Sequence, residues 1–246
     1  MIDIWGITDV GLVRRENQDA YKVRQETASG HAVCVVCDGM GGTAGGRQAS
    51  HIAAETFVEA LERLLRPGMT AEELKTASAL AVSVANQAVQ EAAASSLEYQ
   101  NMGTTLVSAV SFEGGMVICN VGDSRAYRLT PQGITRITRD HSLVEHMVER
   151  GDITAEEARR HPNRNVITRA LGPDEDVECD TYLCPMEPGD WLLLCTDGLV
   201  NTVTDQEMWD TVLHGDEKGG CLNRLLEISK SRGASDNVTV VLMRRP

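Results

Sequence analysis

The sequence has no apolar run that approaches the roughly 20 residues needed for a helix to cross a bilayer. Its first residues also lack the basic stretch and the long apolar stretch that together mark a secretory signal peptide. We therefore expect a cytoplasmic protein with no membrane partner.

Basic residues are scarce. The chain of 246 residues has 23 Lys and Arg against 36 Asp and Glu, a net charge of −13, and no basic cluster stands out. A nucleic-acid-binding surface needs such a cluster to neutralise phosphates, so we expect no nucleic-acid partner. The same charge repels any anionic substrate unless cations or a few well-placed arginines reverse the field locally.

Long linkers rich in Pro, Gly or Ser are absent, as are internal repeats. With 42% hydrophobic and 24% charged residues, the composition is that of an ordinary globular protein. We predict a single domain over residues 1–246.

The seven cysteines include only one close pair, Cys34 and Cys37, and no second pair at zinc-finger spacing. This pair has the spacing of some redox and metal sites, but it lies inside an apolar run, where a strand would point the two side chains to opposite faces. We interpret the cysteines as buried, reduced thiols.

Apolar and β-branched runs predict strands, and apolar residues at helical spacing predict two long amphipathic helices that would cover a sheet. The strands are predicted at 32–37, 104–112, 116–121, 191–195 and 238–243, and the helices at about 49–65 and 74–92. Further helices are expected where Thr70, Ser142, Thr154 and Thr204 are each followed three residues later by Glu, the pattern of a capping box. Strands at both ends with helices between them favour an α+β fold.

Four aspartates stand where apolar strands end or begin, namely Asp38, Asp123, Asp197 and Asp236. Clustered carboxylates repel one another unless a hard cation neutralises them, and Mg²⁺ and Mn²⁺ prefer oxygen ligands. A glycine follows Asp38 and Asp197, where it would let the backbone turn and expose a carbonyl. Any one of these aspartates alone is more simply explained as a turn or cap residue, but the shared position of all four indicates a metal site.

Seven motifs, in order along the chain, resemble those of the metal-dependent serine/threonine protein phosphatases of type 2C in their compact bacterial form. They are TDVGLVRRENQD at 8–19, DGMGG at 38–42 with AGG at 44–46, MGTT at 102–105, VGDSRAY at 121–127, TRDHS at 138–142, LCTDGL at 194–199 and SDNVT at 235–239. The resemblance covers about 230 residues.

The resemblance implies a four-layer α-β-β-α sandwich, in which two antiparallel sheets are flanked by helices and metals lie at one end. It implies Mn²⁺ or Mg²⁺ as cofactor, with two tightly bound ions and a weaker third. By this resemblance Asp38 bridges the two ions, the Gly39 carbonyl binds the second, Asp197 and Asp236 bind the first, and Asp123 binds the third. Asp19 would orient a metal-bound water, and Arg14 would clamp the phosphate of the substrate.

The implied activity is hydrolysis of phosphoserine and phosphothreonine in proteins, in bacterial signal transduction, by a monomer that counteracts a serine/threonine kinase. A non-catalytic metal-binding regulatory module of the same fold is the main alternative, and a two-metal nuclease or other phosphodiesterase is a second. The presence of Arg14 and the five aspartates weighs against the first, and the acidic charge weighs against the second.

Two positions depart from the family pattern. Met40 stands where many members carry a histidine that is a candidate general acid, so that role is open; His141 and Asp140 are candidates, although Asp140 is equally well explained as a helix N-cap. Gln18 replaces a glutamate beside Asp19.

The segment 151–172 coincides with the mobile flap of the family, and its arginines would either guide phosphopeptides or simply be solvated.

Overall fold

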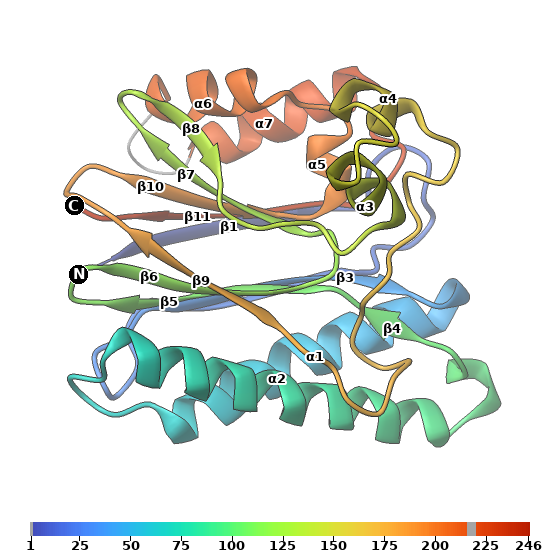
Figure 1. The fold of residues 1–246 in the computed structure, drawn as a ribbon, viewed down its shortest axis with the longest axis horizontal. Coiled ribbons are helices and arrows are strands. Elements are labelled where there is room, and N and C mark those ends of the chain that lie inside the picture. Colours follow the sequence, from blue (N-terminus) through green and yellow to red (C-terminus); the bar gives the residue numbers. More distant parts are fainter. Residues whose placement is uncertain (1, 216–219) are drawn as a thin grey trace.

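The computed structural model describes residues 2–215 and 220–246, with the backbone alone at 43 and 44. Two antiparallel sheets lie face to face, and helices cover the outer face of each (Figure 1). The predicted α+β fold and its four-layer sandwich are confirmed.

The first sheet contains the first and last strands of the chain. In spatial order its strands are β1 (Asp3–Asp9), β11 (Val238–Arg244), β10 (Trp191–Cys195), β7 (Arg125–Thr130) and β8 (Gly133–Arg136). The second sheet has the order β2 (Asp19–Arg24), β3 (Val33–Met40), β5 (Leu106–Phe112), β6 (Gly115–Val121) and β9 (Asp180–Pro185), and β4 (Gly103–Thr104) pairs with the end of β3. The run predicted as one strand at 104–112 is therefore divided at Thr105.

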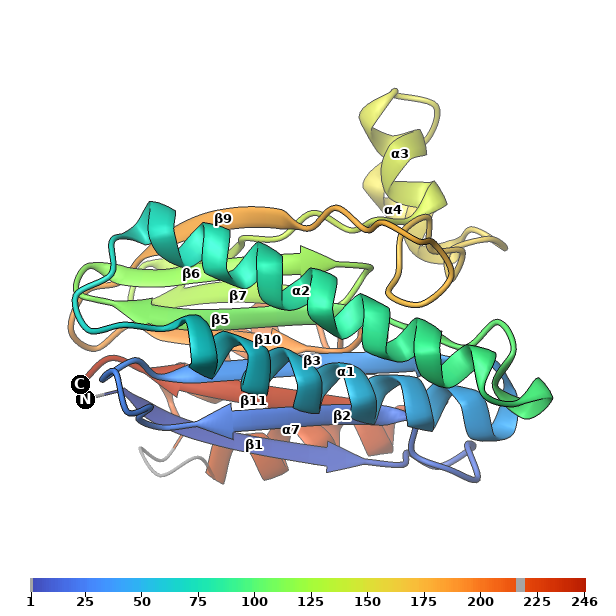
Figure 2. The same cartoon turned by 90° about the horizontal axis from the view of Figure 1, so that it is seen from below.

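Two long helices, α1 (Gly42–Leu64) and α2 (Ala71–Ala94), cover the second sheet, and a 3₁₀ turn, η1 (Leu97–Tyr99), follows them. The first sheet is covered by α5 (Asp197–Val200), α6 (Asp205–Leu213) and α7 (Gly220–Ser231). Between β8 and β9 the chain forms α3 (Leu143–Glu149) and α4 (Ala155–Arg160), which project from the end of the sandwich (Figure 2).

Alternation along β3 divides its side chains between two cores. Cys34 and Val36 face the layer between the sheets, whereas Val33, Val35 and Cys37 face the helices. All five are fully buried, and each buried aliphatic side chain contributes about 1.5–3 kcal/mol. Cys34 and Cys37 are therefore core residues on opposite faces, as predicted, and all seven cysteines are free thiols.

Three of the four predicted capping boxes form completely, at Thr70, Thr154 and Thr204. Ser142 caps α3 by accepting a hydrogen bond from the Glu145 backbone N–H, but the return bond is not made. The Glu145 carboxylate instead pairs with Arg136 of β8. The ion pair with Arg136 of β8 has thus replaced the hydrogen bond that the Glu145 carboxylate would accept from the Ser142 backbone in a capping box.

Candidate functional site

A cavity of about 580 Å³ opens at one end of the sandwich, where loops from both sheets meet. Six of the seven predicted site residues line it: Arg14, Asp38, Gly39, Asp123, Asp197 and Asp236. The seventh, Asp19, is not among the lining residues and lies in the protein interior beside Asp38, its register partner across β2 and β3.

Strand ends deliver the four lining aspartates to this cavity. Asp38 is the third residue from the C-terminal end of β3. Asp123 follows β6 after Gly122, whose φ of 101° lets the chain turn away from the sheet. Asp197 is the first residue of α5 and is separated from the end of β10 by Thr196 alone, and Asp236 lies two residues before β11 begins. Because β10 and β11 are antiparallel neighbours, the end of one lies beside the start of the other.

Gly39 is required for a different reason from the predicted turn. It continues β3 in extended pairing with Thr104, and a Cβ at this position would lie 2.0 Å from the Gly46 carbonyl oxygen. Gly198 is similar, since a Cβ there would lie 1.9 Å from the Asn237 oxygen. Close backbone packing, rather than a turn at these residues, excludes any side chain, and the turn predicted at both positions is wrong.

The electrostatics of the site favour a cation. Burial, and then the neighbouring charges of Asp19 and Asp197, hold the pKa of Asp38 well above its usual value. Burial together with Asp197 and Asp140 raises the pKa of Asp123 to about 8. Burial and the charge of Asp236 also raise the pKa of Asp197. A divalent cation would stabilise the ionised forms of these carboxylates.

Asp19 is almost completely buried, with 3% of its surface exposed. Its Oδ2 accepts hydrogen bonds from the hydroxyls of Thr196, at 2.9 Å, and Thr239, at 2.7 Å. Its Oδ1 is buried and has no hydrogen-bond partner among the described residues. Burial is the main cause that raises the pKa of Asp19 to about 7. An orphaned carboxylate oxygen next to Asp38 fits a water molecule held at a metal centre.

The donor set of the cavity suits a hydrated hard cation. Within residues 2–215 and 220–246, no three His, Cys, Asp or Glu side chains come close enough together to enclose an ion by themselves. Mg²⁺ keeps several of its waters and typically takes one or two carboxylates, so such a cage is not needed. Carboxylate and backbone oxygens, without a thiolate or imidazole among the lining residues, are the ligands that Mg²⁺ and Mn²⁺ prefer.

Arg14 lies on the loop between β1 and β2, and its Nη2 donates to Asp236 Oδ2 at 2.9 Å. This hydrogen bond is the main cause that raises the pKa of Arg14. The side chain is 54% exposed, so its guanidinium stays accessible from the cavity mouth. Arg15 lines the same cavity.

Asn237 organises this loop, a role that sequence reasoning missed. Its Oδ1 accepts from the Gln18 backbone N–H at 2.8 Å, and its Nδ2 donates to the carbonyls of Val10 and Glu16. The loop that carries Arg14 is thus fixed to the start of β11 at both of its ends. The position of Asn237 directly after Asp236, within the SDNVT motif, is a signal from which this role could have been predicted.

The two candidate general acids do not line the cavity. Asp140 accepts hydrogen bonds from Nε and Nη2 of Arg125 and forms an ion pair with it. The interpretation of Asp140 as a helix N-cap is wrong, because Ser142 caps α3. His141 accepts from the Gly122 backbone N–H through Nδ1, and its Nε2 lies 3.3 Å from Asp180. Burial lowers the pKa of His141, which favours the neutral ring.

The segment 151–172 forms one wall of the site. Asn165 and Ile167 of this segment line the cavity. Arg169, near the end of this segment, pairs with Asp180 at 2.9 Å and anchors it to β9.

Comparisons with known proteins agree with this architecture. The family model described as protein phosphatase 2C matches residues 14–217. A serine/threonine phosphatase, stp, of Listeria welshimeri is 37% identical over 97% of this chain and 94% of its own length. The crystal structure of the serine/threonine phosphatase Stp1 from Staphylococcus aureus is 34% identical, covers 99% of this chain and 95% of that chain, and has a TM-score of 0.92.

The structure of the catalytic domain of the serine/threonine protein phosphatase PstP, in complex with two manganese ions, has a TM-score of 0.84 at 30% identity and covers 99% of this chain and 97% of that chain. None of the described helices is long and apolar enough to cross a membrane. With a family model over most of its length and relatives similar over nearly all of it, the chain belongs to the protein phosphatase 2C family.

Proposed function

We propose that the protein is a metal-dependent phosphatase that hydrolyses phosphoserine and phosphothreonine in proteins. The observation that supports this most is a cavity lined by the carboxylates of Asp38, Asp123, Asp197 and Asp236 together with the accessible guanidinium of Arg14. The named activities of the relatives are consistent with it, as is the pair of manganese ions in PstP.

Each candidate residue has a proposed role. Asp38 would contact two Mn²⁺ or Mg²⁺ ions, with Gly39 contributing its carbonyl to the second and Asp197 and Asp236 completing the first. Asp123 would hold a weaker third ion. When bound, the pair of ions supplies a water that is acidic enough to react near neutral pH and offsets negative charge on the phosphoryl group.

The remaining steps belong to the side chains. Arg14 would leave Asp236 to bind two phosphoryl oxygens through its planar fork, which fixes the orientation of the phosphate. Asp19, held rigidly by Thr196 and Thr239, would orient the attacking water through its unpaired oxygen. With neither Asp140 nor His141 lining the cavity, solvent water is the proton donor that we propose for the leaving group.

A cysteine mechanism is not supported, although Cys119 and Arg125 have the Cys-x5-Arg spacing of cysteine-dependent phosphatases. Cys119 is completely buried in β6, and its contact with Cys179 and its burial hold the pKa of its thiol well above the usual value. Arg125 is bound to Asp140. A thiolate nucleophile needs a low pKa and access to the substrate, and Cys119 has neither.

The test compares p-nitrophenyl phosphate, bis(p-nitrophenyl) phosphate and a phosphothreonine peptide, each with Mn²⁺ and with EDTA. We expect Mn²⁺-dependent hydrolysis of the monoester and the peptide, with the diester much slower. Faster hydrolysis of the diester would indicate a phosphodiesterase, and no hydrolysis at any Mn²⁺ concentration would indicate the non-catalytic module. Asp38→Asn is the matched inactive control.

Three further expectations belong to this proposal. The protein would act in the cytoplasm, as a monomer, against the products of a serine/threonine kinase. Cell fractionation tests the first, light scattering after gel filtration tests the second, and a phosphoproteome compared with and without the gene tests the third.

A further inference from the structure

A second groove, of about 490 Å³, runs from the active-site cavity between the projecting helices and the segment 200–205. The two hollows share Asp123, Asn165 and Asp197 in their linings, so they adjoin one another. A polypeptide whose phosphorylated residue lies in the cavity therefore has a path along which its neighbouring residues can lie.

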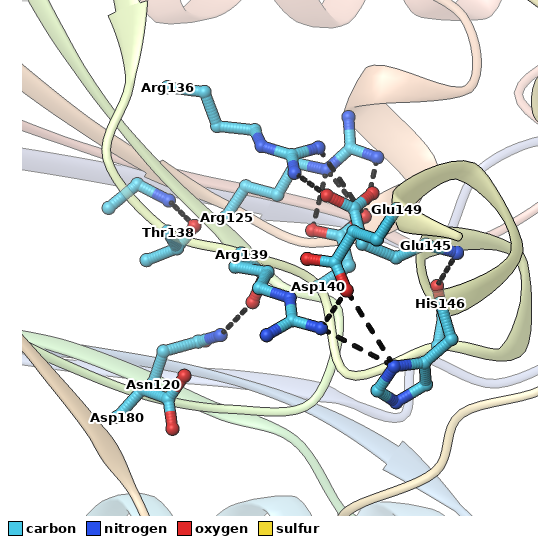
Figure 3. A network of polar contacts seen from close by, with 12 residues as sticks. Asn120, Arg125, Arg136, Thr138, Arg139, Asp140, Glu145, His146, Glu149 and Asp180 are labelled. Carbon is cyan, nitrogen blue, oxygen red and sulfur yellow. Dashed lines mark hydrogen bonds and ion pairs between the residues drawn. The ribbon is translucent and has the colours of Figure 1, made fainter. Parts of the chain in front are cut away.

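Four charged groups that line the second groove are paired with one another. Arg125 binds Asp140, with Nη2 and Oδ2 separated by 2.6 Å, and Arg136 binds Glu145 (Figure 3). Asp140 and Glu145 therefore do not oppose an incoming anion with an unpaired charge.

Two arginines at the rim are different. Arg159 of α4 and Arg164, just beyond it, are exposed, line the second groove, and form no ion pair with any carboxylate that the structure describes. The other arginines of the same segment are engaged: Arg160 pairs with Glu156 at 3.0 Å, and Arg169 pairs with Asp180. Within the segment 151–172, Arg159 and Arg164 are thus the arginines whose charge is available to bind an anion in the groove.

Three carboxylates weigh against these charges, namely Asp205 and the two that the groove shares with the cavity, Asp123 and Asp197. Asp205 lines the second groove without an ion pair among the described residues, but it lies in the first turn of α6, where the helix dipole stabilises its charge. Asp123 and Asp197 face the cations of the proposed function, which would neutralise them, so the two available arginines exceed the one remaining carboxylate. The groove rim is thus locally basic in a chain of net charge −13, which otherwise repels acidic segments.

The groove also offers apolar contacts. Val144 and Val148 of α3 face it from one side, and Val200 and Val203 face it from the other. A mixture of apolar walls and a few charged groups at the rim is typical of sites that bind a chain segment and select among its side chains.

We propose that the second groove binds the residues of the substrate protein next to the phosphorylated one, and that Arg159 and Arg164 select an acidic side chain there. This inference rests on the proposed function, because the groove adjoins the cavity in which the phosphate would lie. The recognised chemistry is an anion on the substrate polypeptide, either Asp and Glu or a second phosphorylated residue.

The test measures kcat/KM for phosphothreonine peptides that are neutral, that carry Glu at each flanking position in turn, or that carry a second phosphothreonine at the same positions. Wild type, Arg159→Ala, Arg164→Ala and the double variant are compared, each normalised to its own rate on p-nitrophenyl phosphate. Arg160→Ala is the matched control, because it removes the same charge from the same helix. The ratio between Glu and second-phosphate peptides identifies which anion the groove prefers.

We expect wild type to prefer the best acidic peptide over the neutral one by about tenfold in kcat/KM. Each exposed ion pair contributes up to about fivefold, and two arginines are available. The double variant should bring this ratio close to one, Arg160→Ala should leave it unchanged, and Arg159→Glu with Arg164→Glu should reverse it in favour of a Lys-containing peptide. An unchanged ratio in the double variant, or an equal loss in Arg160→Ala, would overturn the proposal. Failure of the proposed function is distinct, since then no peptide would be hydrolysed at all.

Discussion

Replacement of Asp19 by Asn is expected to remove a pH-dependent loss of stability from the metal-free protein. The carboxylate is buried, and its pKa of about 7 lies far above the usual 3.8. The folded protein therefore holds a proton that the unfolded chain has already released, and stability falls as pH rises from about 4 until it levels off above about 7. Asn keeps an oxygen that can accept the hydrogen bonds of Thr196 and Thr239 but has no charge to titrate.

The magnitude follows from the two pKa values. Between about pH 5.5 and pH 8.5, ionisation of Asp19 costs on the order of 2 kcal/mol, since one pKa unit corresponds to about 1.4 kcal/mol. The raised pKa values of Asp38, Asp123 and Asp197 add losses of the same sign, so wild type should lose at least this much.

The assay is urea denaturation in EDTA at both pH values, for wild type, Asp19→Asn and the exposed control Glu113→Gln. We expect Asp19→Asn to reduce the difference in unfolding free energy between the two pH values by roughly 2 kcal/mol, and the control to behave as wild type. Added Mn²⁺ should restore most of the stability of wild type at the higher pH, because a cation that binds only the folded state shifts the equilibrium toward it. The reasoning is refuted if wild type and Asp19→Asn lose the same stability between the two pH values.

Three other substitutions test the proposed roles of the lining residues. Asp38→Ala should lower kcat by more than about a hundredfold while circular dichroism shows a retained fold, and activity within about tenfold of wild type would contradict contact with both ions. Arg14→Ala should raise KM for a phosphopeptide with little change in calorimetric metal affinity; the reverse pattern would make its ion pair with Asp236 purely structural. Asp123→Asn should keep two tight ions but lose much of its turnover, with partial recovery at higher Mn²⁺, whereas unchanged stoichiometry and rate at every Mn²⁺ concentration would exclude a third-ion role.

The sequence predicts best those strands and helices whose stabilising features lie within a few neighbouring residues. The strands predicted at 116–121, 191–195 and 238–243 agree with the structure to within a residue at each end, because their apolar residues are buried on both faces of a sheet. Thr70, Thr154 and Thr204 begin helices through contacts with a residue three positions away. Such interactions need no knowledge of the rest of the fold.

Elements with weaker local signals depended on the tertiary structure. Strands β1, β2, β7, β8 and β9 were not predicted, because each mixes polar with apolar residues and gains its stability from a neighbouring strand. Helix α1 begins at Gly42 and not near Ala49, although glycine disfavours helices. Packing of α1 against α2 and the second sheet overrides this preference.

The sequence by itself predicted six residues that line one cavity, through the aspartates at strand ends and the family motifs. Only the tertiary structure decided how they meet. Arg14 contacts Asp236 across 222 positions of the chain, and Thr239 donates to Asp19 across 220. The second groove likewise exists only because α4 faces the segment 200–205. Contacts of this range depend on strand order and register, which arise from the burial of whole faces and not from any local run of residues.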